Sequence, residues 1–320
     1  MKQSIVALSV LACLSSTAWS QSKKVNFDFG WKFMEQDVAG AQAASFDDTK
    51  WQNIDLPHDW DIFHAPYADA PAGNGGGYYP GGTGWYRKQI NDTDLRLANG
   101  ETLWLNFEGV YQCSEIFVNG TKVSTHAYGY TPFKVNITPY IIKGINTIAV
   151  RVNNSKQPNC RWYSGSGIYR HVWLETYNEN KMDDPQKLFV RTDKVYGISA
   201  DGTHADSAAV HITYDGKLDE TRMLKNVELW SPANPKLYDI NVGELTVRHG
   251  IRTFTYDSTH GFILNGQPTL INGACVHHDD GIIGAMAFDA AEIRKVRLMK
   301  EAGFNLIRTS HNPQTRAMLD

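Results

Sequence analysis

The chain has 320 residues, and its 31 basic and 34 acidic side chains give a formal net charge of −3. With 42% hydrophobic and 12% aromatic residues it suits two or three globular domains with real cores, and it lacks the basic surface of a nucleic-acid-binding protein. Apart from Cys13, three cysteines remain at wide spacing, which is neither a disulfide framework nor a Cys-x-x-Cys metal motif.

Residues 1–20 have the features of a secretory signal peptide. Residues 5–14 carry no charge but are too few to span a bilayer as a helix, and Ala18-Trp19-Ser20 supplies small residues at the cleavage position. We therefore expect export to the periplasm or the exterior, with a mature chain that begins near Gln21. The alternative is a lipoprotein with its lipid on Cys13, which would leave an unusually short leader.

Residues 21–178 predict an all-β domain. Short segments with alternating or apolar character recur along it, and turn signals such as Asn119-Gly120 and Lys143-Gly144 lie between them. The strands expected from this pattern are 84–90, 101–107, 114–118, 133–137, 146–152 and 167–174. Such a series of short strands is typical of a β-sandwich.

Residues 70–84 interrupt this rhythm of strands. The segment holds seven glycines and two prolines around Tyr78 and Tyr79. Long glycine-rich loops with aromatic tips often line binding sites, and an idle surface loop is the alternative.

Residues 187–258 predict a second sandwich, of immunoglobulin type. Only about 70 residues are available where such domains need about 100, so one or two strands are expected to be missing. The gaps are placed near residues 216–225 and 242–245.

Residues 259–320 have the pattern of a parallel α/β barrel. Residues 289–301 place Ile293, Val296 and Met299 on one face of an amphipathic helix, which Asp289 can cap.

Buried strands are expected on both sides of this helix, at residues 270–276 and 304–307, and Gly303 ends the helix before the second strand. Both strands end in polar residues, which in a parallel barrel would form neighbouring walls of one pocket. A complete barrel needs about 250 residues, so this part is expected to be only the start of one.

Motifs in this last part resemble a known enzyme family. Asn-x-x-Arg-Thr-Ser-His-x-Pro at residues 305–313 follows Met-Lys-x-x-Gly at 299–303 and Asn-Gly-x-x-x-His-x-Asp at 272–279. Together they resemble glycoside hydrolase family 2, the β-galactosidase and β-glucuronidase family, and residues 106–111 and 117–120 resemble its sugar-binding domain. The resemblance implies a multidomain, mostly β protein with a jelly-roll-like sandwich, an immunoglobulin-like sandwich and an incomplete (β/α)8 TIM barrel.

The resemblance also implies an O-glycosyl hydrolase, of β-galactosidase type, that cleaves terminal β-glycosides with retention of configuration. Two Glu are expected to carry this reaction, and both would lie beyond Asp320, so we expect the chain alone to be an inactive fragment. The alternatives are a β-glucuronidase or β-mannosidase of the same family, and a non-catalytic carbohydrate-binding sandwich protein.

Several family positions present in the chain would hold the sugar. Asp279 would accept two sugar hydroxyls, with a surface turn as its alternative, and Arg308 would offer a bidentate fork to a carboxylate. His311 would contact the sugar and strengthen its hydrogen bonds as charge develops. His277 matches the family's His, and a packed, hydrogen-bonded His is the alternative.

Two further positions depart from this simple pattern. Asn312 stands where the family more often has Tyr, which changes the shape of the pocket. His171, in the first sandwich, occupies a place from which some β-galactosidases reach the sugar, and a surface His is the alternative.

Metals and partners complete the expectations. His277, His278, Asp279 and His311 could ligate zinc, but adjacent ligands on one strand diverge, so we expect no metal site and give His278 no role. The resemblance to β-galactosidases allows Mg²⁺ or Na⁺ in the whole enzyme. A carbohydrate is the expected partner, without nucleic acid or a membrane span, and the open strand edges of a partial barrel favour a homo-oligomer.

Overall fold

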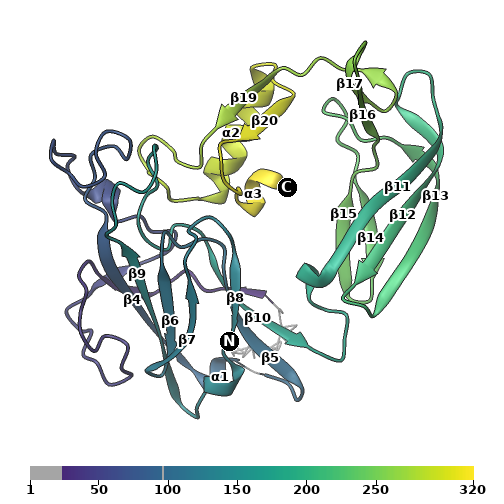
Figure 1. Cartoon of the computed structure of the whole chain (residues 1–320). Coiled ribbons are helices and arrows are strands. Elements are labelled where there is room, and N and C mark those ends of the chain that lie inside the picture. Colours follow the sequence, from purple (N-terminus) through teal and green to yellow (C-terminus); the bar gives the residue numbers. More distant parts are fainter. Residues whose placement is uncertain (1–23, 96) are drawn as a thin grey trace, which may run out of the picture.

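The computed structural model describes residues 24–95 and 97–320 (Figure 1). The expected signal peptide, with Cys13, lies outside these residues. The described chain forms two β-sandwiches and a β-α-β segment, so the expected multidomain, mostly β fold is confirmed. No helix within the described ranges is long and apolar enough to cross a membrane.

The first sandwich consists of two antiparallel sheets. In the order in which its strands pair, the four-stranded sheet contains β1 (Lys24–Asn26), β10 (Val172–Asn178), β5 (Glu101–Phe107) and β8 (Phe133–Asn136). The six-stranded sheet contains β3 (Gln52–Ile54), β2 (Trp31–Met34), β4 (Gly82–Asn91), β9 (Ile145–Asn154), β6 (Ser114–Val118) and β7 (Thr121–His126). A single helical turn, α1 (Asp92–Leu95), follows β4.

The expected strands of this sandwich are present, and β5 and β6 have the expected bounds. The strand expected at 167–174 begins only at Val172, because the residues before it bond elsewhere: Gly167 exchanges two backbone hydrogen bonds with Tyr111, and the His58 N–H donates to Ile168. The sequence pattern missed β1, β2, β3 and β7, which are short or largely polar.

The core of the first sandwich lies between its two sheets. Alternate residues of a strand share one face, and on β5 this places Leu103, Leu105 and Phe107 fully inside. Ile148 and Val150 of β9 face them from the other sheet and are also fully buried. Burying a side chain of this size contributes roughly 1.5–3 kcal/mol, so the strands are held mainly by this shared face.

A buried arginine holds an irregular segment against the six-stranded sheet. Arg87 of β4 has no exposed surface, and its Nε donates to the Asp48 carboxylate at 2.8 Å. Its Nη1 donates to the carbonyl oxygens of Ala41 and Ala43. One guanidinium therefore fixes residues 41–48, which have no strand or helix of their own.

The second sandwich is short, as expected, with five strands where immunoglobulin domains have at least seven. Its strands are β11 (Leu188–Ile198), β12 (His204–Tyr214) and β13 (Leu218–Glu228) in one sheet and β14 (Tyr238–Val242) and β15 (Leu245–His249) in the other. Residues 216–225 lead into β13 and form most of it, and residues 242–245 contain the turn between β14 and β15.

A small antiparallel sheet leads from the second sandwich into the barrel segment. It contains β16 (Phe254–Asp257), β17 (Gly261–Leu264) and β18 (Gln267–Pro268). The β17–β18 turn has positive φ at Asn265 and Gly266, which fits the Asn-Gly signal in the sequence.

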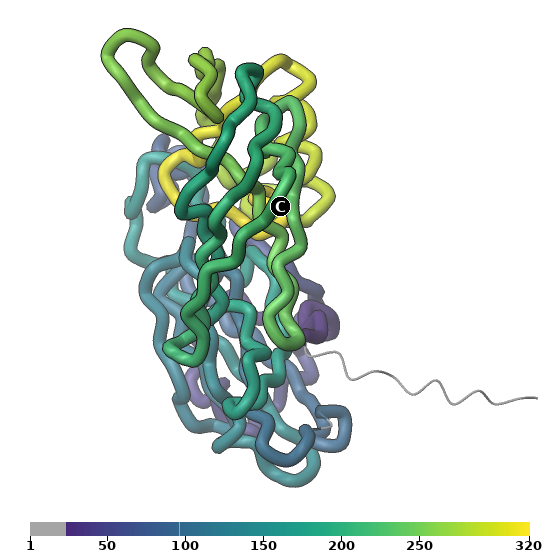
Figure 2. The backbone as a smooth tube through the Cα atoms, turned by 90° about the vertical axis from the view of Figure 1, so that its right-hand side faces the viewer, coloured from purple at the N-terminus to yellow at the C-terminus, as the bar shows by residue number. Residues whose placement is uncertain are grey.

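The barrel segment contains β19 (Gly273–Val276), α2 (Asp289–Glu301), β20 (Leu306–Thr309) and the short helix α3 (Arg316–Leu319). The two strands pair in parallel, with Val276 opposite Thr309, so their carboxyl ends lie side by side as expected. Figure 1 shows this segment above the first sandwich, and Figure 2 shows it near the top of the molecule, behind the second sandwich.

Helix α2 has the expected bounds, and Gly303, with φ of +88°, follows its end as expected. Asp289 is not its cap. Phe288 occupies that position without a side-chain hydrogen bond, and Asp289 is the first helical residue.

The expected apolar face of α2 is present only in part. Val296 and Met299 are half-buried, but Ile293 is 46% exposed, whereas Glu292 is buried. Glu292 turns inward because its carboxylate accepts hydrogen bonds from Lys295 and Thr315. The strand expected at 304–307 begins two residues later, and its residues alternate between exposed and half-buried rather than being buried.

Replacing Arg87 by Lys should destabilise the first sandwich. A single ammonium cannot reach Asp48 and two carbonyls together, so at least one buried acceptor loses its donor, which costs about 2 kcal/mol. Urea unfolding followed by tryptophan fluorescence measures the loss. The matched control is Arg191→Lys, since Arg191 is exposed and its ion pair with Asp193 contributes little. Equal effects of the two substitutions would contradict the anchoring role of Arg87.

Candidate functional site

The candidate site lies at the carboxyl ends of β19 and β20. His277 follows β19, and Ser310-His311, joined by a cis peptide bond, follows β20. The imidazole rings of His277 and His311 have their centroids 5.9 Å apart and stand nearly perpendicular, at 88°. The structure therefore brings two of the predicted sugar-binding residues together from separate strands.

Arg308 supplies the positive charge of this site. Its Nη2 lies 3.2 Å from His311 Nδ1, and its Nη1 lies 3.3 Å from Ser310 Oγ and 3.5 Å from Cys275 Sγ. Hydrogen bonds from Ser310 and Arg308 lower the pKa of the Cys275 thiol. Within the described ranges, no carboxylate forms an ion pair with Arg308, so its fork can receive an acid from a ligand or another segment.

The two aspartates after β19 differ in their surroundings. Asp280 lies 3.6 Å from the Lys295 ammonium of α2. Asp279 is half-buried and has no hydrogen-bond partner among the described residues. Of the two carboxylates, Asp279 is therefore the one with oxygens available to sugar hydroxyls.

A buried layer lies behind these exposed groups. Asn312 is buried, and its Nδ2 lies 3.4 Å from Nδ1 of His278, whose Nε2 lies 3.2 Å from the Ser164 carbonyl oxygen of the first sandwich. Burial lowers the pKa of His278 to about 3, so its ring is neutral. A neutral ring that donates from Nε2 to Ser164 can accept at Nδ1 from Asn312, and both bonds are then satisfied.

His171 is not brought together with the other predicted residues. Its Nδ1 lies 2.6 Å from Asp28 of the same sandwich, and its Nε2 lies 3.2 Å from Asp289 at the start of α2. Burial opposes its protonation, but the hydrogen bond and charge of Asp28, together with the charges of Asp289 and Glu108, outweigh burial and raise the pKa of His171 to about 8. The side chain thus links the sandwich to the barrel segment.

A buried carboxylate also joins these two parts. Asp59 accepts hydrogen bonds from Tyr163 Oη at 2.5 Å, from the Ser166 N–H at 2.9 Å and from the Ala285 N–H of the barrel segment at 2.9 Å. A side chain at Gly165 would collide with Ala285, since its Cβ would lie 2.5 Å from the Cβ of Ala285. The close approach of backbone at this position requires glycine.

Sequence reasoning missed one aromatic residue of the site, Trp162. Its ring lies 5.1 Å from that of His311 and 6.0 Å from that of His277, although it belongs to the first sandwich. No local pattern in the sequence marks this residue, because both contacts join segments that are distant along the chain.

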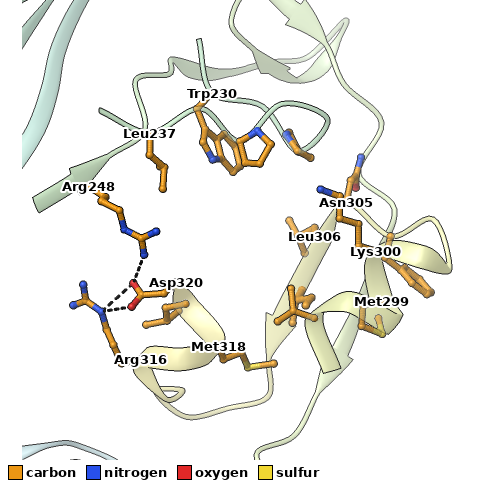
Figure 3. A pocket seen from close by; sticks show the side chains of 16 residues that line it. Trp230, Leu237, Arg248, Met299, Lys300, Asn305, Leu306, Arg316, Met318 and Asp320 are labelled. Carbon is orange, nitrogen blue, oxygen red and sulfur yellow. Dashed lines mark hydrogen bonds and ion pairs between the residues drawn. The ribbon is translucent and has the colours of Figure 1, made fainter. Parts of the chain in front are cut away.

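A cavity of about 450 Å³ lies elsewhere, between the second sandwich and the barrel segment. Figure 3 shows Trp230 and Leu237 on one side and Met299 and Leu306 on the other. None of the predicted sugar-binding residues lines it. It lies at the amino end of β20, whereas ligands of parallel barrels meet the carboxyl ends, so we do not assign the sugar to it.

The residues at the strand ends do not fit a bound Mg²⁺ or Na⁺. Such ions take several oxygen ligands, but Asp280 faces Lys295 and Asp279 offers a single carboxylate. In the part of the chain that the structure describes, no three His, Cys, Asp or Glu side chains are grouped closely enough to hold a metal ion.

Two parts of the chain match descriptions of a known protein family. Residues 31–178 match the family description "Glycosyl hydrolases family 2, sugar binding domain", and residues 258–320 match "Glycosyl hydrolases family 2, TIM barrel domain". The chain belongs to glycoside hydrolase family 2.

Relatives within glycoside hydrolase family 2 match nearly the whole chain. A β-galactosidase from Bacteroides ovatus is 36% identical over 97% of the chain and 41% of its own length. A putative β-glucuronidase from Formosa agariphila is 32% identical over 95% of the chain and 32% of its own length. A solved family 2 structure from Bacteroides cellulosilyticus has a TM-score of 0.80 and 34% identity, and covers 93% of this chain and 44% of that one. The chain therefore spans less than half the length of these family 2 proteins.

The link through His171 predicts a pH-dependent stability. The folded pKa of about 8 lies above the unfolded value of about 6.5, so the stabilisation is fully present below about pH 6.5 and is lost as pH rises through about 8. The difference corresponds to about 2 kcal/mol.

Thermal unfolding of wild type and His171→Gln between about pH 6 and 9 measures this contribution, and the variant should lose the alkaline decline. Asp289→Asn should keep most of it, because Asp28 is the stronger partner. Parallel profiles for wild type and His171→Gln would show that His171 does not cause the decline.

Proposed function

We propose that this chain forms the sugar-holding part of a retaining glycoside hydrolase that cleaves terminal β-glycosides, with β-galactosides as its main substrates. The observation that carries the proposal is the pairing of His277 and His311 at the carboxyl ends of two parallel strands. Parallel barrels bind their substrates at this edge. Arg308, 3.2 Å from His311, adds the charge that such a site uses.

Retaining hydrolysis needs two carboxylates about 5 to 5.5 Å apart across the scissile bond. The described residues offer no such pair at the strand ends. Asp280 and Glu292 both pair with Lys295, and Asp59 is buried. We therefore propose that the acid and the nucleophile are two Glu outside residues 24–320, and that Arg308 holds one of them with its fork.

The relatives support the choice of substrate. The B. ovatus and Thermoanaerobacter pseudethanolicus proteins are named β-galactosidases, at 36% and 27% identity, whereas three Formosa agariphila proteins carry β-glucuronidase names. Galactosides are thus our first proposal and glucuronides the second.

Export and assembly are parts of the same proposal. The charge-free run at residues 5–14 supports export to the periplasm or the exterior. Leu270 and Ile282, which are 86% and 95% exposed, support association of the chain through apolar surface into a homo-oligomer.

Hydrolysis of nitrophenyl β-glycosides tests the function. We expect the complete product of the gene to cleave the galactoside faster than the glucuronide, mannoside or glucoside, and the 320-residue chain to cleave none. Cleavage by the short chain would overturn the assignment of the carboxylates to other residues. Binding of galactosides without any cleavage by the complete product would favour the non-catalytic carbohydrate-binding protein.

Substitution of His311 by Ala in the complete protein should lower kcat by about 10²-fold, since one hydrogen bond to developing charge is lost. The matched control is His126→Ala, because His126 belongs to β7 of the sandwich, where its Nε2 lies 3.0 Å from Thr131 Oγ1. Steady-state kinetics on the best substrate provides the measurement. An unchanged kcat in His311→Ala would show that His311 does not act on the bound sugar.

A further inference from the structure

Trp162 lies against both histidines of the candidate site. Its ring centroid is 5.1 Å from that of His311, at an interplanar angle of 40°, and 6.0 Å from that of His277, at 63°. The three rings come from three separate segments of the chain. Trp162 is the one that the first sandwich contributes.

A hydrogen bond from the indole N–H fixes the orientation of the Trp162 ring. Its Nε1 donates to Tyr130 Oη at 2.9 Å, and Tyr130 is buried and packs against the His278 ring at 5.1 Å. Trp162 itself is only partly buried and belongs to none of the hydrophobic core clusters. The indole N–H of Trp162 thus has its hydrogen-bond partner in the protein interior, while the ring lies at the edge of the site.

The glycine-rich loop supports the segment that carries Trp162. A Cβ at Gly75 would lie 3.2 Å from Arg161 Cα, so the loop backbone packs directly on this segment. Tyr79 of the loop packs on Tyr163 with ring centroids 5.1 Å apart. These two contacts, one at the residue before Trp162 and one at the residue after it, hold Trp162 toward the strand ends.

We propose that Trp162 is a sugar-binding residue whose indole face stacks on the apolar face of the glycoside. The inference rests on the proposed function and adds to it a residue that would distinguish galactosides from other glycosides. In a galactoside the axial hydroxyl at carbon 4 leaves the C–H groups of carbons 3, 4 and 5 together on the opposite face. That face fits an aromatic ring, while His277, His311 and Asp279 have polar atoms for the hydroxyls.

Stacking and simple packing between the two domains differ in their consequences. A ring that only packs between domains affects stability and changes the kinetics of all substrates alike. A ring that stacks on the sugar contributes binding energy in both the ground state and the transition state, so its loss raises KM and leaves kcat nearly unchanged. The loss is also larger for a galactoside than for a glucoside, in which the equatorial hydroxyl at carbon 4 interrupts the apolar face.

The first experiment compares Trp162→Ala and Trp162→Phe in the complete protein. We expect Trp162→Ala to raise KM for nitrophenyl β-galactoside about tenfold and to leave kcat within about twofold. Trp162→Phe, which keeps a smaller aromatic face, should raise KM about threefold. The matched control is Trp104→Phe, since Trp104 lies on β5 and bonds Thr102. An unchanged KM in Trp162→Ala, or an equal change for the glucoside, would overturn the inference.

A second experiment makes the outcome independent of catalysis. The 320-residue chain is labelled with 5-fluorotryptophan, its ¹⁹F resonances are assigned with the two Phe variants, and galactose is added. We expect the Trp162 resonance to shift and the Trp104 resonance to stay in place. If the complete protein hydrolyses the glycoside, but the Trp162 resonance does not shift and KM is unchanged in Trp162→Ala, the inference is refuted and the proposed function stands. If the Trp162 resonance shifts but the complete protein hydrolyses no β-glycoside, the inference is supported and the proposed function is refuted. If there is neither a resonance shift nor hydrolysis, the inference and the proposed function are both refuted.

Discussion

The arrangement of the site depends on one buried carboxylate, Asp59. Removing such a group from water is costly, and burial raises its pKa, so it is tolerated only because several donors converge on it. Those donors come from the sandwich, at Tyr163 and Ser166, and from the barrel segment, at Ala285. The Asp59 carboxylate therefore holds the sandwich and the barrel segment at a fixed distance. This in turn fixes the positions of the residues next to these three donors.

The site is built in two layers, and each layer contains contacts from both domains. In the exposed layer, His277 and His311 of the barrel segment meet Trp162 of the sandwich. In the buried layer, the neutral His278 lies between Asn312 and the Ser164 carbonyl oxygen. Neither layer would be complete on the barrel segment alone, because the sandwich forms one side of each.

Local patterns in the sequence were sufficient to predict elements whose conformation is set by neighbouring residues. The alternation in β5, the Asn119-Gly120 turn and the bounds of α2 were predicted in this way, and so was the adjacency of the two strand ends. The inward turn of Glu292 was not, because it depends on Thr315, which is 23 residues away. The approach of Trp162 to His277 was missed for the same reason, since no local pattern encodes a contact between two domains.

The long separation of these partners also bears on the order in which the molecule is assembled. Asp59 and Ala285 are 226 residues apart, and Arg170 and Pro313, which are joined by a hydrogen bond, are 143 residues apart. The sandwich leaves the ribosome first and can fold as a unit, whereas such distant contacts close large loops and form late. A sandwich that folds first would present Asp59 and Arg170 as preformed hydrogen-bond partners for the barrel segment that emerges after it.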